Sequence, residues 1–127
     1  ISKILGATAQ ELIFTSGATE SNNLAVKGAY DYRSRNHGRN KILISKIEHK
    51  CVIEAAKSLK SFGAEVVYID VNKEGIVDLD QLEDSIDDKV ALVSIMFDTL
   101  SLIFFWSDFF PFAENITIGG SSAIALK

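Results

Sequence analysis

One stretch decides the fold of this chain: Phe14-Thr15-Ser16-Gly17-Ala18-Thr19-Glu20-Ser21-Asn22-Asn23. An apolar run, Leu12–Phe14, leads into a turn of small residues, and a helical pattern follows at once. The unpaired backbone N–H groups and the positive end of the dipole at a helix N-terminus favour an anion. The stretch therefore predicts a phosphate cradle at Gly17–Thr19.

Two familiar phosphate-binding motifs do not match this stretch. No Gly-Lys-Ser/Thr follows it, which excludes a P-loop, and the next glycine after Gly17 is Gly28, which excludes the dinucleotide fingerprint. The residues also allow an ordinary helix start, in which Ser16 or Thr19 is the N-cap and Glu20 favours the first turn. From the residues alone, both interpretations stay open.

Short apolar runs alternate with helical patterns from Glu11 to Met96. We expect strands at residues 12–15, 41–45, 65–69 and 91–95, and helices at about 21–35, 52–62 and 79–86. The residues expected on the buried helix faces are Leu24, Ala25, Gly28, Ala29 and Tyr32; Val52, Ala55, Ala56, Leu59 and Phe62; and Leu79, Leu82 and Ile86. The alternation predicts an α/β fold with a partial doubly wound, mostly parallel sheet.

Ligands of such sheets bind beyond the carboxyl ends of the strands. Gly17–Thr19 follows the first expected strand, and Lys46–His49 follows the second. We therefore expect both motifs on the same rim of the sheet.

Four segments together resemble the cysteine desulfurases (NifS/IscS-like), a branch of the class V, fold type I enzymes that use pyridoxal 5′-phosphate. They are residues 11–23, Lys46–His49, Asp70–Gly75 and Val93–Met96. The resemblance implies that residues 1–96 are the N-terminal part of the large domain of such a transferase. Residues 97–127 carry no resemblance, and we interpret them as a separate apolar tail, most simply a frameshifted or read-through end.

The resemblance assigns three residues to the cofactor. Ala18 and Thr19 match the pair that holds the phosphate of pyridoxal phosphate, and His49 matches the histidine that stacks on its pyridine ring and takes part in proton transfers. An imidazole suits that role because it is planar and titrates near neutrality. From the residues alone, a lone histidine such as His49 is more often a surface or capping group than a catalytic one.

Cys51 is the only cysteine of the chain, which excludes an internal disulfide and indicates a reducing compartment, interpreted here as the cytoplasm. It begins a helix close to His49, where a thiolate would be stabilised. Residues two apart on a helix do not face each other, however. We therefore predict a small half-buried residue and not a nucleophile.

The resemblance also says what the matched segments do not include. The family's Asn-Asn-Glu turn is replaced by Phe97-Asp98-Thr99, and neither its Schiff-base lysine nor its persulfide-forming cysteine has a counterpart here. We therefore assign no catalytic residue, expect at most weak binding of the cofactor, and expect the chain alone to be inactive and to fold poorly. Release of sulfide from cysteine, or a cooperative thermal transition, would contradict these expectations.

The parent reaction implied by the resemblance moves sulfur from L-cysteine to a cysteine of the enzyme and leaves alanine. The implied partners are a sulfur-acceptor protein and a second copy of the chain, since the family enzymes are homodimers. Two alternatives stay open. One is a related class V enzyme, such as a selenocysteine lyase or an aminotransferase. The other is a non-enzymatic remnant that binds an intact desulfurase subunit.

Composition excludes several other function classes. A net charge of −4 without a long basic patch gives no support to nucleic-acid binding. The apolar run at 100–106 is far shorter than the ~20 residues of a membrane span, and the first residues do not have the pattern that we would expect of a signal peptide. The acidic residues between Asp78 and Asp88 predict a solvated helix face, so we assign no metal ligand.

Residues 1–6 are typical of the end of a helix.

Overall fold

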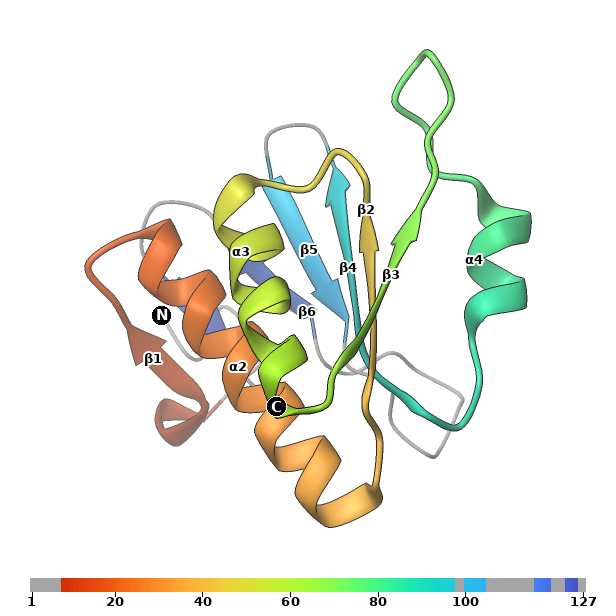
Figure 1. Ribbon diagram of the computed structural model, residues 1–127. Coiled ribbons are helices and arrows are strands. Elements are labelled where there is room, and N and C mark those ends of the chain that lie inside the picture. The colour runs from red at the N-terminus through yellow and green to blue at the C-terminus, as the bar shows by residue number, and fades with distance from the viewer. Residues whose placement is uncertain (1–7, 98–99, 105–115, 120–122, 126–127) are drawn as a thin grey trace.

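The computed structural model describes residues 8–97, 100–104, 116–119 and 123–125 (Figure 1). The helix end expected at residues 1–6 lies outside this part of the chain. In chain order the elements are η1 (Ala9–Glu11), β1 (Leu12–Phe14), α2 (Ala18–His37), β2 (Lys41–Ser45), α3 (Lys50–Ser58), η2 (Leu59–Phe62), β3 (Glu65–Ile69), α4 (Leu79–Ser85), β4 (Val90–Phe97), β5 (Leu100–Phe104), β6 (Ile116–Gly119) and β7 (Ala123–Ala125).

The main sheet has five strands in the order β3-β2-β4-β5-β6. Strand β2 lies at its parallel core, because it pairs in parallel with both β3 and β4. The pairs β4–β5 and β5–β6 are antiparallel, so the sheet is mixed. The predicted α/β class and the three parallel strands at residues 41–45, 65–69 and 91–95 are thus confirmed.

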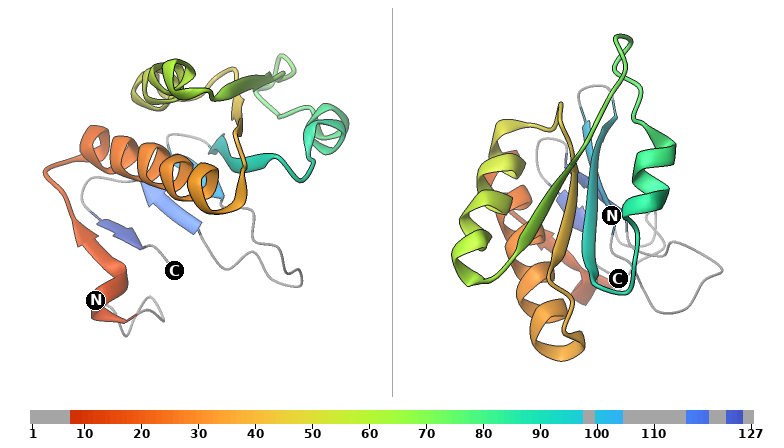
Figure 2. Two further views of the ribbon diagram at one scale, coloured as in Figure 1. Left: turned by 60° about the horizontal axis from the view of Figure 1, so that its bottom comes forward. Right: turned by 45° about the vertical axis from the view of Figure 1, so that its right-hand side comes forward.

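The sheet is covered on both faces. Figure 2 shows α2 and α3 on one face of the sheet and α4 on the other. The side chains of β2 alternate accordingly: Ile42 and Ile44 join the core cluster under α2 and α3, whereas Leu43 joins the cluster that includes Leu82 and Ile86. This alternation explains why the three central residues of the strand are all apolar, since a parallel strand between two helical layers has no polar face.

Strand β1 departs from the prediction. It pairs antiparallel with β7 in a separate two-stranded sheet and does not join the parallel sheet. Ile13 and Phe14 are correspondingly exposed, with 67% of Phe14 accessible to solvent. A short apolar run looks the same in sequence whether it enters a buried sheet or an exterior ribbon, so only the partner strand distinguishes the two.

The buried faces of the helices are only partly as predicted. Helix α2 buries Ser21, Asn22, Ala25, Val26 and Tyr30, while the expected Leu24 and Tyr32 are exposed. Phe62 and Leu79 are exposed as well. Residues that pack against the core as expected are Val52, Ala55, Ala56, Leu59, Leu82 and Ile86. Apolar periodicity missed the polar start of the buried stripe on α2, because Ser21 and Asn22 carry no hydrophobic signal.

The tail beyond residue 96 contributes three of the described strands. Strands β5 and β6 extend the main sheet from β4, and β7 pairs with β1. The division at residues 96 and 97 stays a prediction. Within the described residues, no helix combines the length and the apolar character needed to cross a membrane.

Candidate functional site

The candidate site lies where α2 and α3 begin. The two helix starts meet through the side chain of Asn22 on α2, which donates a hydrogen bond to Cys51 Sγ on α3 at 3.1 Å. The stretches Gly17–Thr19 and Lys46–His49 therefore belong to one rim, at the carboxyl end of β2. The prediction that both stretches follow strands of one parallel sheet is only partly right. Lys46–His49 follows β2 of that sheet, but β1, which precedes Gly17–Thr19, lies outside it.

Helix α2 begins at Gly17, which is its N-cap. The sequence-based alternative that Ser16 or Thr19 caps the helix is therefore wrong. The φ of Gly17 is 165°, an extended conformation open to any residue, and a Cβ added there would have no atom within 4 Å. Neither backbone conformation nor internal packing requires a glycine at this point, and the following Ala18 and Thr19 are exposed.

Local hydrogen bonds hold the turn before α2. The backbone N–H and the hydroxyl of Ser16 donate to Glu20 Oε2 at 2.8 and 2.7 Å. These bonds, the one from the side chain first, hold the pKa of Glu20 below its ordinary value. Thr15 Oγ1 lies 2.5 Å from Ser21 Oγ. All these contacts span six residues or fewer, so the turn is fixed by its own side chains.

Helix α3 begins differently, at His49. This residue is the N-cap, and its Nδ1 accepts a hydrogen bond from Cys51 N at 3.3 Å. The rest of the imidazole is exposed on the rim. The capping role that sequence analysis left open is thus present, and it leaves a ring face available for other contacts. Stacking of His49 on a cofactor stays a prediction.

A buried carboxylate anchors this second helix start. Glu48 is buried, and its Oε2 accepts from the backbone N–H of His49 at 2.9 Å. Its Oε1 accepts from Ser94 Oγ of β4 at 2.5 Å, and Ser94 is fully buried. Sequence analysis did not assign Ser94 a role. The available signal was a serine inside the apolar strand Val90–Phe97, because a buried hydroxyl needs a hydrogen-bond partner.

Cys51 contacts His49, although the sequence predicted that these two side chains do not face each other. Its Sγ lies 3.0 Å from His49 Nδ1. The prediction that the two side chains do not face each other is wrong, because the helical spacing rule needs both residues inside the helix. His49 precedes the helix with φ −59° and ψ 140°, and from there its ring reaches back over the first turn. The thiol is half-buried, as predicted.

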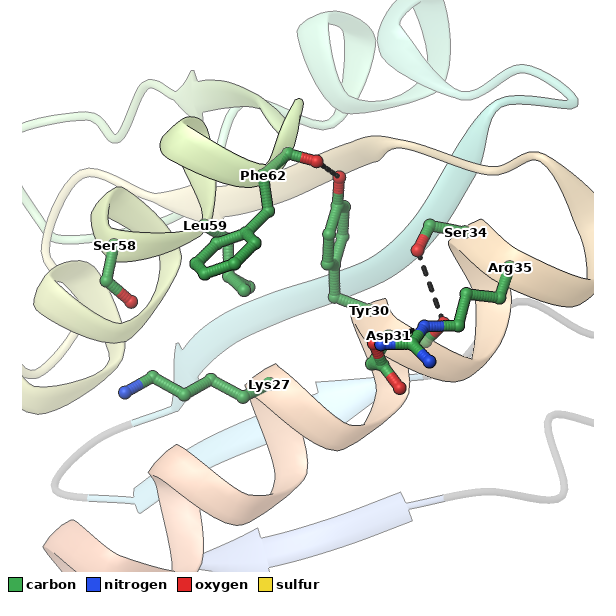
Figure 3. A pocket seen from close by; sticks show the side chains of 8 residues that line it. All are labelled: Lys27, Tyr30, Asp31, Ser34, Arg35, Ser58, Leu59 and Phe62. Atoms are coloured by element: carbon green, nitrogen blue, oxygen red, sulfur yellow. Dashed lines mark hydrogen bonds and ion pairs between the residues drawn. The ribbon is translucent and has the colours of Figure 1, made fainter.

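A separate hollow lies along the helices. A pocket of about 620 Å³ lies between the second half of α2 and the end of α3 with η2. Figure 3 shows the side chains that line it. Tyr30 crosses it and donates a hydrogen bond to the carbonyl oxygen of Phe62 at 3.1 Å. None of Ala18, Thr19 and His49 lines this pocket, so it is distinct from the rim.

Two acidic residues of the α4 region have structural partners. Asp78 caps α4 by accepting from Gln81 N at 3.0 Å. Asp87 lies 2.5 Å from Lys41 Nζ, and the hydrogen bond from this lysine holds the pKa of Asp87 below its ordinary value. Across the described ranges, no group of three or more His, Cys, Asp or Glu side chains is arranged to hold a metal ion.

Comparison with known proteins agrees with this architecture. The sequence profile described as "Aminotransferase class-V" matches residues 1–99. The mitosomal cysteine desulfurase of Trachipleistophora hominis is 47% identical over 96 residues, which cover 76% of this chain and 22% of that protein. The cysteine desulfurase IscS of Ehrlichia chaffeensis is 49% identical over 96 residues, which cover 76% of this chain and 23% of that protein.

A solved structure shows the same fold. The solved structure of a NifS-like protein is 39% identical and has a TM-score of 0.66, with 75% of this chain and 26% of that chain covered. The chain thus spans about a quarter of the length of the proteins that it matches. With the profile matched over residues 1–99, this chain belongs to the class-V aminotransferase family, and its similar relatives are cysteine desulfurases.

Proposed function

We propose that this chain is the part of a cysteine desulfurase that holds pyridoxal 5′-phosphate by its phosphate and one face of its ring. One observation carries the proposal: the contact between Asn22 and Cys51 joins the starts of α2 and α3 at one rim. The family is dependent on pyridoxal phosphate, and the relatives are named for the removal of sulfur from cysteine. The substrate that we propose is accordingly L-cysteine.

The start of α2 fits a phosphate group. Gly17 has open space where a side chain would be, although its own backbone conformation does not require glycine. The exposed Ala18 and Thr19 follow it, with the N–H groups of the first helical turn and the hydroxyl of Thr19 as donors. Together with the helix dipole, these groups provide what a phosphate needs. We assign the phosphate to Ala18 and Thr19.

The start of α3 fits the ring. His49 offers an exposed imidazole, and two hydrogen bonds hold this residue in place. Its backbone N–H donates to Glu48 Oε2, and its ring nitrogen Nδ1 accepts from Cys51 N. Anchoring of this kind restricts the motion of the ring before a ligand arrives. When bound, pyridoxal phosphate supplies the electron sink for the chemistry at cysteine. In this proposal His49 orients the cofactor and exchanges protons at its exposed nitrogen.

The remaining parts of the proposal rest on the resemblance to the family described above. A sulfur-acceptor protein receives the product, and the protein acts as a homodimer. The lone cysteine agrees with a reducing compartment, which we propose to be the cytoplasm. The named relatives also include a mitosomal form.

Binding of pyridoxamine 5′-phosphate tests the assignment. This analogue lacks the aldehyde, so it cannot condense with surface lysines, and pyridoxamine is the matched ligand without phosphate. We expect the phosphorylated ligand to bind more tightly, as measured by ligand-observed NMR titration. Thr19→Val is expected to weaken only the phosphorylated ligand, by about threefold to tenfold for one lost hydrogen bond. His49→Ala is expected to weaken both ligands.

His37→Ala is the matched control, because His37 is the other histidine of the chain and ends α2 far from its first turn. It is expected to leave both affinities unchanged. Equal binding of the two ligands to the unmodified chain would refute the phosphate assignment. An equal effect of His37→Ala and His49→Ala would refute the ring assignment.

A further inference from the structure

The sulfur of Cys51 receives polar contacts from two different elements. His49 Nδ1 lies 3.0 Å from Sγ, and Asn22 Nδ2 of α2 donates to Sγ at 3.1 Å. Cys51 also lies in the first turn of α3, a helix of nine residues. The thiol is half-buried, so it remains accessible from the rim.

These contacts define a direction for the thiol proton. Cys51 N donates to His49 Nδ1, so in the neutral ring this nitrogen carries the lone pair and the ring proton is on Nε2. The same lone pair is within hydrogen-bond distance of the thiol. When the sulfur attacks an electrophile, its proton can pass to Nδ1. The N–H of Asn22 and the N-terminus of α3 then stabilise negative charge on the sulfur.

A second observation at this place points to an added group. Asn22 is only 3% exposed, and within the described residues its Oδ1 has no hydrogen-bond partner. This acceptor belongs to the same carboxamide whose nitrogen contacts Sγ. A buried acceptor without a partner destabilises the folded chain. A group attached to the sulfur and carrying an N–H donor would satisfy it.

We propose that Cys51 is a modification site that forms mixed disulfides with small disulfides bearing N–H donors. In the step, Cys51 Sγ forms a bond to one sulfur of the small disulfide, and the sulfur–sulfur bond of that disulfide breaks. The thiol proton moves to His49 Nδ1 and from there to the departing thiolate. The products are the mixed disulfide and one free small thiol, so no further oxidant is needed. This proposal does not rest on cofactor binding.

The test uses the whole chain and glutathione disulfide, whose amides supply the N–H donors. Since the chain has a single cysteine, the mass of the adduct reports on Cys51 alone. The rate of adduct formation is measured for the native chain and for the same chain in denaturant, at one pH. We expect the native chain to react about tenfold faster or more, because a positioned base assists the transfer of the proton.

The variant His49→Asn separates the base from the cap. Asparagine is a good N-cap, so helix α3 is retained while the imidazole is lost. We expect its rate to fall by about threefold or more but to stay above that of the denatured chain, because the Asn22 contact and the N-terminus of α3 remain, whereas His37→Asn keeps the native rate. Asn22→Ala is expected to slow the reaction by about threefold, the effect of one hydrogen bond, and Asn36→Ala on the outer side of α2 is its control.

Two results would overturn the proposal. One is a native chain that reacts no faster than the denatured chain. This comparison uses only the unmodified chain and so does not depend on whether a variant folds. The other is a His49→Asn chain that keeps its far-ultraviolet circular dichroism and reacts as fast as His37→Asn.

Discussion

The starts of α2 and α3 form one rim but are built in opposite ways. The turn before α2 follows β1, a strand outside the main sheet, and is held by exposed contacts such as those of Ser16 with Glu20. The turn before α3 follows β2, the central parallel strand, and is held by the buried pair of Glu48 and Ser94. The core of the protein thus holds the turn before α3, whereas the turn before α2 is held by its own side chains.

The difference has an energetic meaning. Hydrogen bonds away from water are stronger, and leaving one partner unpaired there is costly, whereas exposed contacts are weakened by solvent and salt. We therefore expect changes near α3 to affect the stability of the chain much more than changes near α2. The following predictions test this contrast.

The largest effect is expected in the strands themselves. Leu43→Ala in β2 removes a side chain with no exposed surface and should lower the free energy of unfolding by about 2–5 kcal/mol. Phe14→Ala in β1 removes a larger but mostly exposed side chain and should change it by about 0.5 kcal/mol or less. Denaturant titration measures both, and comparable losses would show that β1 is as much part of the core as β2.

Ser94→Ala tests the buried anchor of α3. It deprives Glu48 Oε1 of the hydroxyl at 2.5 Å, and we expect a loss of about 1–3 kcal/mol in the free energy of unfolding. Ser61→Ala is the control, since Ser61 is exposed and bonds only to the carbonyl of Ser58. A neutral effect of Ser94→Ala would mean that the anchor is not a determinant of this helix start.

Gly38 and Gly17 differ in whether the backbone conformation requires a glycine. Gly38 ends α2 with φ 67°, a left-handed conformation, and Gly38→Ala should cost about 1 kcal/mol of stability. Gly17→Ala should leave stability nearly unchanged, because its φ is extended and no atom lies within 4 Å of the added Cβ. If phosphate binds there as proposed, Gly17→Ala weakens pyridoxamine 5′-phosphate in the same NMR titration. A large loss of stability from Gly17→Ala would contradict the statement that this position has room for a side chain, and unchanged binding would contradict the phosphate assignment.

The smallest effect concerns pH and the exposed turn before α2. The pKa of Glu20 is lowered in the folded chain, chiefly by the hydroxyl of Ser16, from an ordinary value of 4.5. A lowered pKa means that its stabilising contribution is present above the ordinary value and is lost as pH falls through the lower folded value. Glu20→Gln should therefore narrow the difference in stability between neutral and acidic pH. Unfolding curves of both chains across this acid range measure it, and identical pH profiles would contradict the assignment.

Several features followed from local sequence because their causes are local. The three strands at residues 41–45, 65–69 and 91–95 are runs of apolar residues long enough to span a two-sided core, and the helices between them imply parallel pairing. The resemblance to cysteine desulfurases likewise depended only on contiguous motifs. For the same reason the sequence located the two helix starts that carry Ala18, Thr19 and His49.

Other features depended on surfaces that are distant in the chain. Whether Leu12–Phe14 entered the sheet was decided by its pairing with Ala123–Ala125, more than a hundred residues away, which no local pattern encodes. The burial of Asn22 depends on the first turn of α3, because a buried polar side chain needs a hydrogen-bond partner and Cys51 Sγ accepts from its Nδ2.

By itself, then, the sequence determined the α/β class, the parallel core and the position of both helix starts, since apolar period and chain connection are properties of neighbouring residues. Only the tertiary structure decided that β1 lies outside the sheet, that Glu48 is anchored by Ser94, and that Cys51 meets both His49 and Asn22. Each of these depends on which side chain arrives from another element, and packing alone determines that.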